Sequence, residues 1–324
     1  MKASVVIRTY NEEKYLDRLL TGVLAQQSDR FDIEPVIIDS GSTDRTLEIA
    51  EKHGCRVTHI KKSDFTFGRS LNWGCKFASG DFLVFVSGHC FPVENNWLHE
   101  LVSPLADGLC DYSYGRQMGK ETTKYSEYQH FAKHFPEYSK LPQEGYFCNN
   151  ANAAITRAAW QRYKFDEELT GLEDMHLAKR LVADGGKVGY VSSAPVYHIH
   201  DESWQQVRTR YEREAYALQK IMPQMHFTVG DFFRYFTASL LTDSSAAISD
   251  RVFLRKFSEI FMFRLMFYWG TYRGHHEVRQ LSAEMKRKYF YPSHNEVNTH
   301  EQTKNRRATP YESQQPAREG KEFS

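Results

Sequence analysis

The sequence predicts an α/β protein in which a mostly parallel sheet is flanked by helices and followed by a helical C-terminal extension. Short apolar segments typical of buried strands alternate with amphipathic segments in the N-terminal part of the chain. Polar loops follow several of the apolar segments, and beyond Trp204 the pattern is that of helices. Alternating strands and helices are typical of a parallel sheet covered on both faces.

The N-terminal part is expected to hold four strands separated by three helices. The strands are predicted at residues 4–9, 34–39, 56–60 and 81–86, and the helices at 12–27, 44–52 and 71–78. The first helix has a single apolar face, formed by Leu16, Leu19, Leu20, Val23 and Leu24. The second helix can be capped by Ser42 or Asp44, since either side chain can accept a hydrogen bond from the first turn.

The C-terminal half continues with a helix that starts near Arg157 and another at 172–184, which ends at Gly185-Gly186. Strands are predicted at 187–191 and 195–200, and helices from 204 onward. Residues from 293 are polar and poor in aromatics, so they are expected to be disordered.

Composition narrows the classes of partner and compartment. The 42 basic and 41 acidic residues leave no basic excess, which argues against a nucleic-acid partner. Five scattered cysteines without a CxxC pair favour reduced thiols and a reducing compartment. The N-terminus shows no secretory signal pattern, and the most apolar stretch, 260–270, is interrupted by Arg264 and too short to span a bilayer. A cytoplasmic protein is therefore expected.

Candidate functional residues follow the predicted strands, because sheets of this kind bind ligands beyond the carboxyl ends of their strands. Polar loops stand there at residues 9–12, 39–44 and 87–90. For Ser42 and Asp44, turn and capping chemistry is the alternative interpretation. Asp39 ends an apolar run and needs hydrogen-bond donors, which a nucleobase or a ribose edge would supply.

A series of segments resembles, in order and spacing, the family 2 glycosyltransferases with the GT-A fold. These segments are residues 4–12, 36–46, 68–74, 78–85, 149–155, 165–169, 173–174 and 196–200. The resemblance covers residues 3 to about 215 and is closest to bacterial rhamnosyltransferase-like members. It implies a glycosyltransferase domain at 1–215, with a nucleotide-binding half at about 1–92 and an acceptor half at about 93–215. A helical region at 216–292, a candidate for membrane association, and a tail at 293–324 would follow.

The resemblance also implies roles for individual residues. The implied nucleotide-binding residues are Thr9, Tyr10, Asn11, Glu12, Asp39, Ser42, Arg69 and Asn72. Among them, Thr9, Glu12 and Asp39 would hold the nucleoside and Arg69 would lie near the diphosphate. Asp174, beside Glu173 in the implied catalytic pair, matches the base that takes a proton from the acceptor hydroxyl. The alternative for both acids is to complement the dipole at the start of a helix.

Metal binding is where the sequence departs from the family. The family places Asp-x-Asp after the fourth strand to bind a divalent cation, Mn²⁺ or Mg²⁺, and this chain has Ser87-Gly88-His89. An imidazole at His89 suits Mn²⁺ better than Mg²⁺. His198 and His200 alternate along a predicted strand, so only one is expected to join His89. Family precedent favours His198, and the alternative is a packed or surface histidine.

The leading hypothesis is an inverting glycosyltransferase that moves a sugar from a nucleotide sugar to a glycan or lipid-linked acceptor in bacterial surface polysaccharide synthesis. A catalytically silent relative that binds a nucleotide or glycan is the alternative, because Asp-x-Asp is absent. No GxGxxG follows the first strand, which weakens an oxidoreductase interpretation.

The helical region at 227–291 has two interpretations. Its aromatic side chains can complete a helical core or a dimer contact, or they can join basic residues in a face that lies on the inner membrane leaflet. The basic residues concerned are Arg251, Arg255, Lys256, Arg264 and Arg273.

Overall fold

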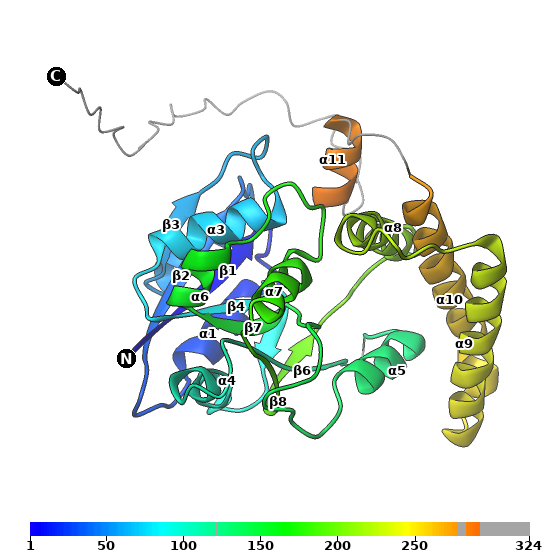
Figure 1. The fold of residues 1–324 in the computed structure, drawn as a ribbon, viewed down its shortest axis with the longest axis horizontal. Helices are drawn as coiled ribbons and strands as arrows, with labels where there is room; N and C mark the ends of the chain where they lie inside the picture. Colours follow the sequence, from blue (N-terminus) through cyan, green and yellow to red (C-terminus); the bar gives the residue numbers. More distant parts are fainter. Residues whose placement is uncertain (121, 278–282, 292–324) are drawn as a thin grey trace. The chain divides into compact units, whose positions relative to one another are not determined.

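The computed structural model describes residues 1–120, 122–277 and 283–291, and centres on a mixed, mostly parallel sheet (Figure 1). The strand order is β3-β2-β1-β4-β7-β6-β8-β5. The strands are β1 (Lys2–Thr9), β2 (Asp32–Asp39), β3 (Arg56–His59), β4 (Phe82–Val86), β5 (Cys90–Pro92), β6 (Tyr112–Met118), β7 (Asn152–Thr156) and β8 (Val188–His198). Strands β1 to β4 pair in parallel, as do β6 and β8, whereas β7 and β5 pair antiparallel to their neighbours.

Helices cover both faces of the sheet. One face packs against α1 (Leu16–Leu24), α2 (Thr46–Lys52) and α4 (Trp97–Ala106), and the other against α3 (Phe67–Phe77), α5 (Tyr125–His134), α6 (Arg157–Tyr163) and α7 (Glu173–Ala183). Neighbouring residues of β1 are buried on opposite faces, since Val5 belongs to one core cluster and Val6 to the other. This burial on both sides explains why the strand is a continuous apolar run.

The C-terminal helices are α8 (Trp204–Ile221), α9 (Val229–Ser249), α10 (Phe253–His275) and α11 (Ala283–Phe290). Figure 1 shows α9 and α10 side by side, away from the sheet. Glycines let α10 approach α8 closely: a Cβ added at Gly270 would lie 2.4 Å from the backbone oxygen of Arg208. No helix within the described ranges combines the length and apolar character needed to cross a bilayer.

A buried ion pair joins α9 to α10. The Arg264 guanidinium donates two hydrogen bonds to the Asp243 carboxylate, from Nε at 2.7 Å and from Nη2 at 2.9 Å. Both side chains are almost fully shielded from solvent. The expectation that Arg264 belongs to a lipid-facing surface is therefore wrong, because its side chain is buried and paired with Asp243.

The predicted N-terminal strands and helices are confirmed, with shifted ends. Helix α1 begins at Leu16 rather than at residue 12, because residues 12–15 form a turn. The strands predicted at 187–191 and 195–200 are one strand, β8, which ends at His198. The domain boundary proposed near 215 falls within α8, and the tail predicted at 293–324 lies outside the described residues. All five cysteines are free thiols, as predicted.

Candidate active site

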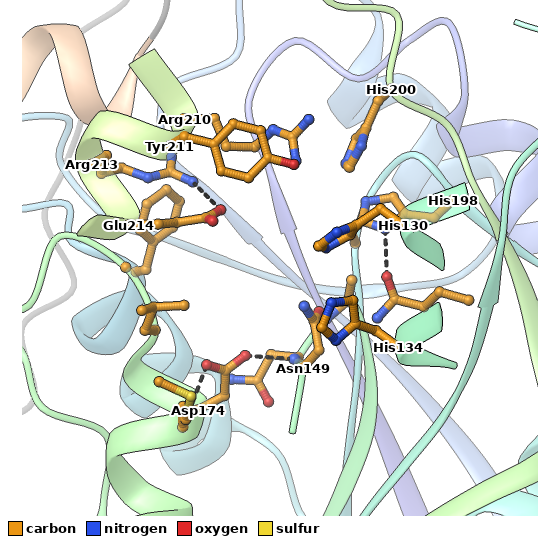
Figure 2. A pocket seen from close by; sticks show the side chains of 18 of the residues that line it. His130, His134, Asn149, Asp174, His198, His200, Arg210, Tyr211, Arg213 and Glu214 are labelled. Carbon is orange, nitrogen blue, oxygen red and sulfur yellow. Dashed lines mark hydrogen bonds and ion pairs between the residues drawn. The ribbon is translucent and has the colours of Figure 1, made fainter. Parts of the chain in front are cut away.

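A cavity of about 390 Å³ opens between the sheet and helices α5 and α8. Its wall is assembled from the ends of β1 and β8, the loop before β7, the start of α7, and one face each of α5 and α8. Figure 2 shows Asp174 on one side of this space, with the side chains of α8 and the histidines of α5 and β8 around it.

Asp174 lies in the first turn of α7 and is almost completely buried. Its Oδ2 accepts a hydrogen bond from the backbone N–H of Asn150 at 2.8 Å, and its Oδ1 accepts one from Met175 at 2.7 Å. Burial, together with the neighbouring Glu173 charge, raises the pKa of Asp174 to about 7. A carboxylate in this state is a competent general base near neutral pH.

Glu173 points to a different partner, as expected for adjacent residues at the start of a helix. Its Oε1 lies 3.4 Å from Nη1 of Arg8, whose guanidinium also covers the Phe67 ring at 4.8 Å. Leu172, just before the pair, has a left-handed backbone with φ of 57°. Such a conformation is costly for a leucine and sets the direction in which the two acids leave the helix start.

Three histidines converge at the other side of the cavity. Ligand nitrogens of His89, His198 and His200 all lie within 4.8 Å of one another. The expectation that only one of the last two could join His89 is wrong. Strand β8 ends at His198, and the backbone N–H of Ile199 bonds to the oxygen of His89, so the alternation of a strand no longer applies at His200.

The hydrogen bonds of these histidines suit metal ligation. Nδ1 of His198 lies 2.7 Å from Oε1 of Gln117, and Nδ1 of His200 lies 2.6 Å from Oε1 of Glu127. Each bond leaves Nε2 free to bind a metal. Gln117 and Glu127 thus stand where the outer-shell partners of metal-bound histidines usually stand. Burial lowers the pKa of His198 well below its ordinary value, so this ring is neutral and able to ligate. The residues present therefore fit a cation that accepts imidazole nitrogen.

Four of the implied nucleotide-binding residues form one loop network at the ends of β1 and β2. Asp39 accepts hydrogen bonds from the amides of Gly41 and Ser42 at 2.8 and 2.9 Å, and from Thr9 Oγ1 at 3.2 Å. These bonds, with His59 nearby, outweigh the opposing effect of burial and hold the pKa of Asp39 below its ordinary value. The backbone N–H of Asn11 donates to Ser42 Oγ at 2.9 Å.

The other four implied nucleotide-binding residues are spread more widely. Tyr10 contacts Lys62, whose Nζ lies 4.3 Å from the ring centroid. Glu12 turns toward the histidines, with Oε1 3.6 Å from Nδ1 of His89. Arg69 pairs with Glu167 at 2.9 Å outside the cavity.

Asn72 lies outside the cavity lining. It is buried and uses its amide to hold the loop after α6, donating to the Phe165 oxygen at 2.9 Å and accepting from the Phe165 amide at 3.1 Å. The amide oxygen also accepts from Trp160 Nε1. In this structure the Asn72 amide therefore has a structural role.

Sequence reasoning missed the contribution of α5 and α8. Arg210 lies in the cavity wall and pairs with Glu127 at 2.6 Å and with Glu202 at 2.7 Å. Arg213 and Glu214 face the same space (Figure 2). The signal was present in the spacing, since positions 210, 213 and 214 share one face of a helix.

Comparison with known proteins gives the class of the chain. The model of glycosyl transferase family 2 matches residues 4–169, which is half of the chain, and the chain belongs to this family. It is therefore a glycosyltransferase.

Two curated relatives share a quarter to a third of their aligned residues with this chain. O-antigen chain rhamnosyltransferase RfbN of Salmonella typhimurium is 25% identical over 224 residues, which are 65% of this chain and 70% of RfbN. O-antigen chain rhamnosyltransferase WbaN of Salmonella anatum is 28% identical over 195 residues, 54% of this chain and 59% of WbaN. The mannosyltransferase PcManGT from Pyrobaculum calidifontis, solved in complex with GDP-Man and Mn²⁺, shares the fold with a TM-score of 0.57 at 16% identity, covering 83% of this chain and 85% of that one.

Proposed function

We propose that the protein transfers a glycosyl unit, with inversion, from a nucleotide sugar to a hydroxyl of a glycan or lipid-linked acceptor in bacterial surface polysaccharide synthesis. The observation that carries this proposal is the buried Asp174 carboxylate at the cavity wall, with its raised pKa. The rhamnosyltransferase relatives support the polysaccharide context.

The proposed step uses Asp174 as the only base. Asp174 takes the proton of the acceptor hydroxyl while that oxygen bonds to the anomeric carbon, the bond from this carbon to the phosphate oxygen breaks, and the nucleoside diphosphate leaves. Glu173 is held by Arg8 and does not serve as a nucleophile. A single displacement inverts the anomeric configuration.

A divalent cation held by His89, His198 and His200 would neutralise negative charge on the leaving diphosphate. Three imidazole nitrogens favour Mn²⁺ over Mg²⁺, which prefers oxygen ligands. Arg210 and Arg213 lie on the opposite wall, where each is paired with a glutamate. The donor half at about 1–92 and the acceptor half at about 93–215 meet at this cavity in the proposal.

Nucleotide-sugar turnover tests this function. The intact protein is incubated with UDP-, GDP- and dTDP-sugars, MnCl₂ and a glycan acceptor, and release of nucleoside diphosphate is measured, with Asp174→Asn as the control. The anomeric proton of the product is then examined by NMR. Retention of the donor's anomeric configuration in the product contradicts the single-displacement mechanism.

The proposal includes peripheral binding of the α9–α10 pair to the inner leaflet of the membrane. Ile248, near the end of α9, and Leu254, at the start of α10, are 61% and 94% exposed. Arg251 lies in the turn between the two helices, and Arg255 in the first turn of α10. Apolar side chains bordered by cations suit an interface of anionic headgroups, and each Arg near the surface contributes about 1 kcal/mol.

Liposome co-sedimentation tests the membrane contact. Wild-type protein should pellet with anionic vesicles at low salt and dissociate as salt rises. Leu254→Asp should abolish pelleting. Val229→Asp is the matched control, because Val229 is 53% exposed but lies at the opposite end of α9. Pelleting of Leu254→Asp at the wild-type level contradicts the proposed contact.

A further inference from the structure

The segment formed by α11 and Tyr291 lies against the strand ends of the proposed donor site. The Tyr291 ring meets the Tyr10 ring edge-on, with centroids 4.8 Å apart. Lys62 Nζ lies over both rings, 4.3 Å from the Tyr10 centroid and 4.6 Å from that of Tyr291. Phe290 is buried against Phe65. An aromatic cluster thus fills the space beside the loop that follows β1.

Helix α8 anchors this segment. Lys288 Nζ lies 2.8 Å from Oε1 of Glu212, and the Tyr289 hydroxyl donates to the same oxygen at 3.3 Å. Nη1 of Arg213 donates to the backbone oxygen of Tyr289 at 3.1 Å. The helix that supplies cationic side chains to the cavity therefore also positions residues 288–291.

The cluster stands where the donor's nucleoside would bind. Thr9 and Asp39 are 3% and 1% exposed, and the cavity lining includes Tyr289 but neither Tyr10 nor Asp39. Burial raises the pKa of Tyr291 to about 12, and the nearby Tyr10 and Asp39 act in the same direction. The Tyr291 ring already contacts the Tyr10 ring near Asp39, so a base that stacks on the same part of Tyr10 would compete with it.

We propose that Tyr291 occupies the nucleoside position of the donor site and that a bound nucleotide displaces it. This inference rests on the proposed function, because it takes the Tyr10–Asp39 loops as the nucleoside site. The segment is then a gate that competes with the donor from within the same chain. Its occupancy lowers the apparent affinity for the donor by the fraction of molecules in which the site is open.

The contacts of Tyr291 are suited to displacement. Its hydroxyl is buried without a well-formed hydrogen bond among the described residues, which is unfavourable for a polar group. A nucleobase on Tyr10 would replace the lost ring contact, and its polar edge would lie near the Asp39 carboxylate, which its own loop holds through Gly41 and Ser42. Loss of the gate by Tyr291→Ala should therefore tighten nucleotide binding by about three- to tenfold.

Calorimetry on the intact protein tests the gate. Wild type, Tyr291→Ala, Tyr291→Phe and Phe233→Ala are each titrated with UDP, GDP and dTDP. Tighter binding only in Tyr291→Ala supports the inference, since the phenylalanine keeps the ring and Phe233 is an exposed residue of α9. Unchanged or weaker binding in Tyr291→Ala overturns it, and weaker binding assigns Tyr291 as a donor contact. If no nucleotide binds to any of the four proteins, the proposed function itself fails, and the gate fails with it.

Hydrogen exchange of the wild type gives a second measurement that needs no variant. Amides of residues 283–291 should exchange faster when the tightest-binding nucleotide is present, because the segment leaves its position. Slower exchange there, with nucleotide bound, would mean that the segment closes over the donor and would overturn the displacement model.

Discussion

The backbone N–H of Asn150 donates a hydrogen bond to the carboxylate of Asp174, 24 residues further along the chain, at 2.8 Å. This bond joins the loop before β7 to the start of α7 and fixes the proposed base at the cavity wall. The second carboxylate oxygen accepts from the Met175 amide, so an asparagine at position 174 can keep only one of the two bonds. Folding of the asparagine variant is therefore measured beside its turnover.

Asp174→Asn should lower kcat by a factor on the order of 10² to 10⁴ and leave donor binding unchanged, since the amide cannot take the acceptor proton. Steady-state kinetics and nucleotide calorimetry measure the two quantities separately. Asp184→Asn, at the other end of α7, is the matched control and should keep wild-type turnover. Full activity of Asp174→Asn would place the base elsewhere.

The pH profile should show the titration of Asp174. The base acts in its deprotonated form, so kcat/KM should rise with pH through a value near the raised pKa of about 7 and fall away below it. The Glu173 charge helps to raise the pKa of Asp174. Glu173→Gln should therefore lower this pKa and move the profile toward lower pH. A profile that Glu173→Gln does not move would show that another group controls the rate.

The histidine cluster predicts a site for Mn²⁺. His200→Ala should weaken Mn²⁺ binding by at least about tenfold, because one of three ligands is lost. Electron paramagnetic resonance of free Mn²⁺ measures the affinity without any substrate. His134→Ala is the control, since His134 lines the same cavity outside the cluster. Equal affinities in both variants would remove the cluster as the metal site.

Asp39→Ala should weaken nucleoside diphosphate binding by about 1.5–3 kcal/mol, through loss of a charge-assisted hydrogen bond. Asp39 also holds the amides of Gly41 and Ser42, so Asp39→Asn serves as a milder second variant. Asp32→Ala, at the other end of β2, should bind as the wild type does. Calorimetry on folded protein decides, and unchanged affinity in both Asp39 variants refutes the assignment.

Gly270→Ala should lower the free energy of unfolding by about 1–3 kcal/mol, since the added methyl group meets the backbone of α8 at 2.4 Å. Gly230→Ala is the control. Its methyl group would have no contact closer than 3.6 Å, so this variant should be neutral or slightly stabilised. Denaturant titration compares the two variants. Similar unfolding midpoints would show that α8 and α10 can move apart to accept the methyl group at little cost.

The sheet and the loop sites were predictable because they depend on local pattern. Val36, Ile37 and Ile38 form an apolar run that ends at Asp39, and this signals a buried strand with a polar terminus. The position of Asp174 at the start of a helix follows in the same way. Strand ends gather at one edge of a parallel sheet, so their loops meet wherever the topology is right.

The remaining parts depend on contacts that local pattern does not encode. His200 joins the cluster because β8 stops two residues earlier, and strand ends are set by the neighbouring strand. The sequence alone suggests that Arg264 is a surface cation, but it pairs with Asp243, which lies 21 residues away in the chain. The sequence alone suggests that Asn72 can contact a ligand, whereas its side-chain amide is hydrogen-bonded to Trp160 and Phe165.

The cavity draws its walls from stretches that are far apart in the chain, from Arg8 on β1 to Arg213 on α8. A protein is translated from its N-terminus, and its parts tend to fold in that order. A growing chain therefore contains Asp174 and His198 before it contains α8, and α8 is packed only once Gly270 has been added. During translation the base is made before the helices that complete the cavity wall, and Tyr289 is the last lining residue to be added.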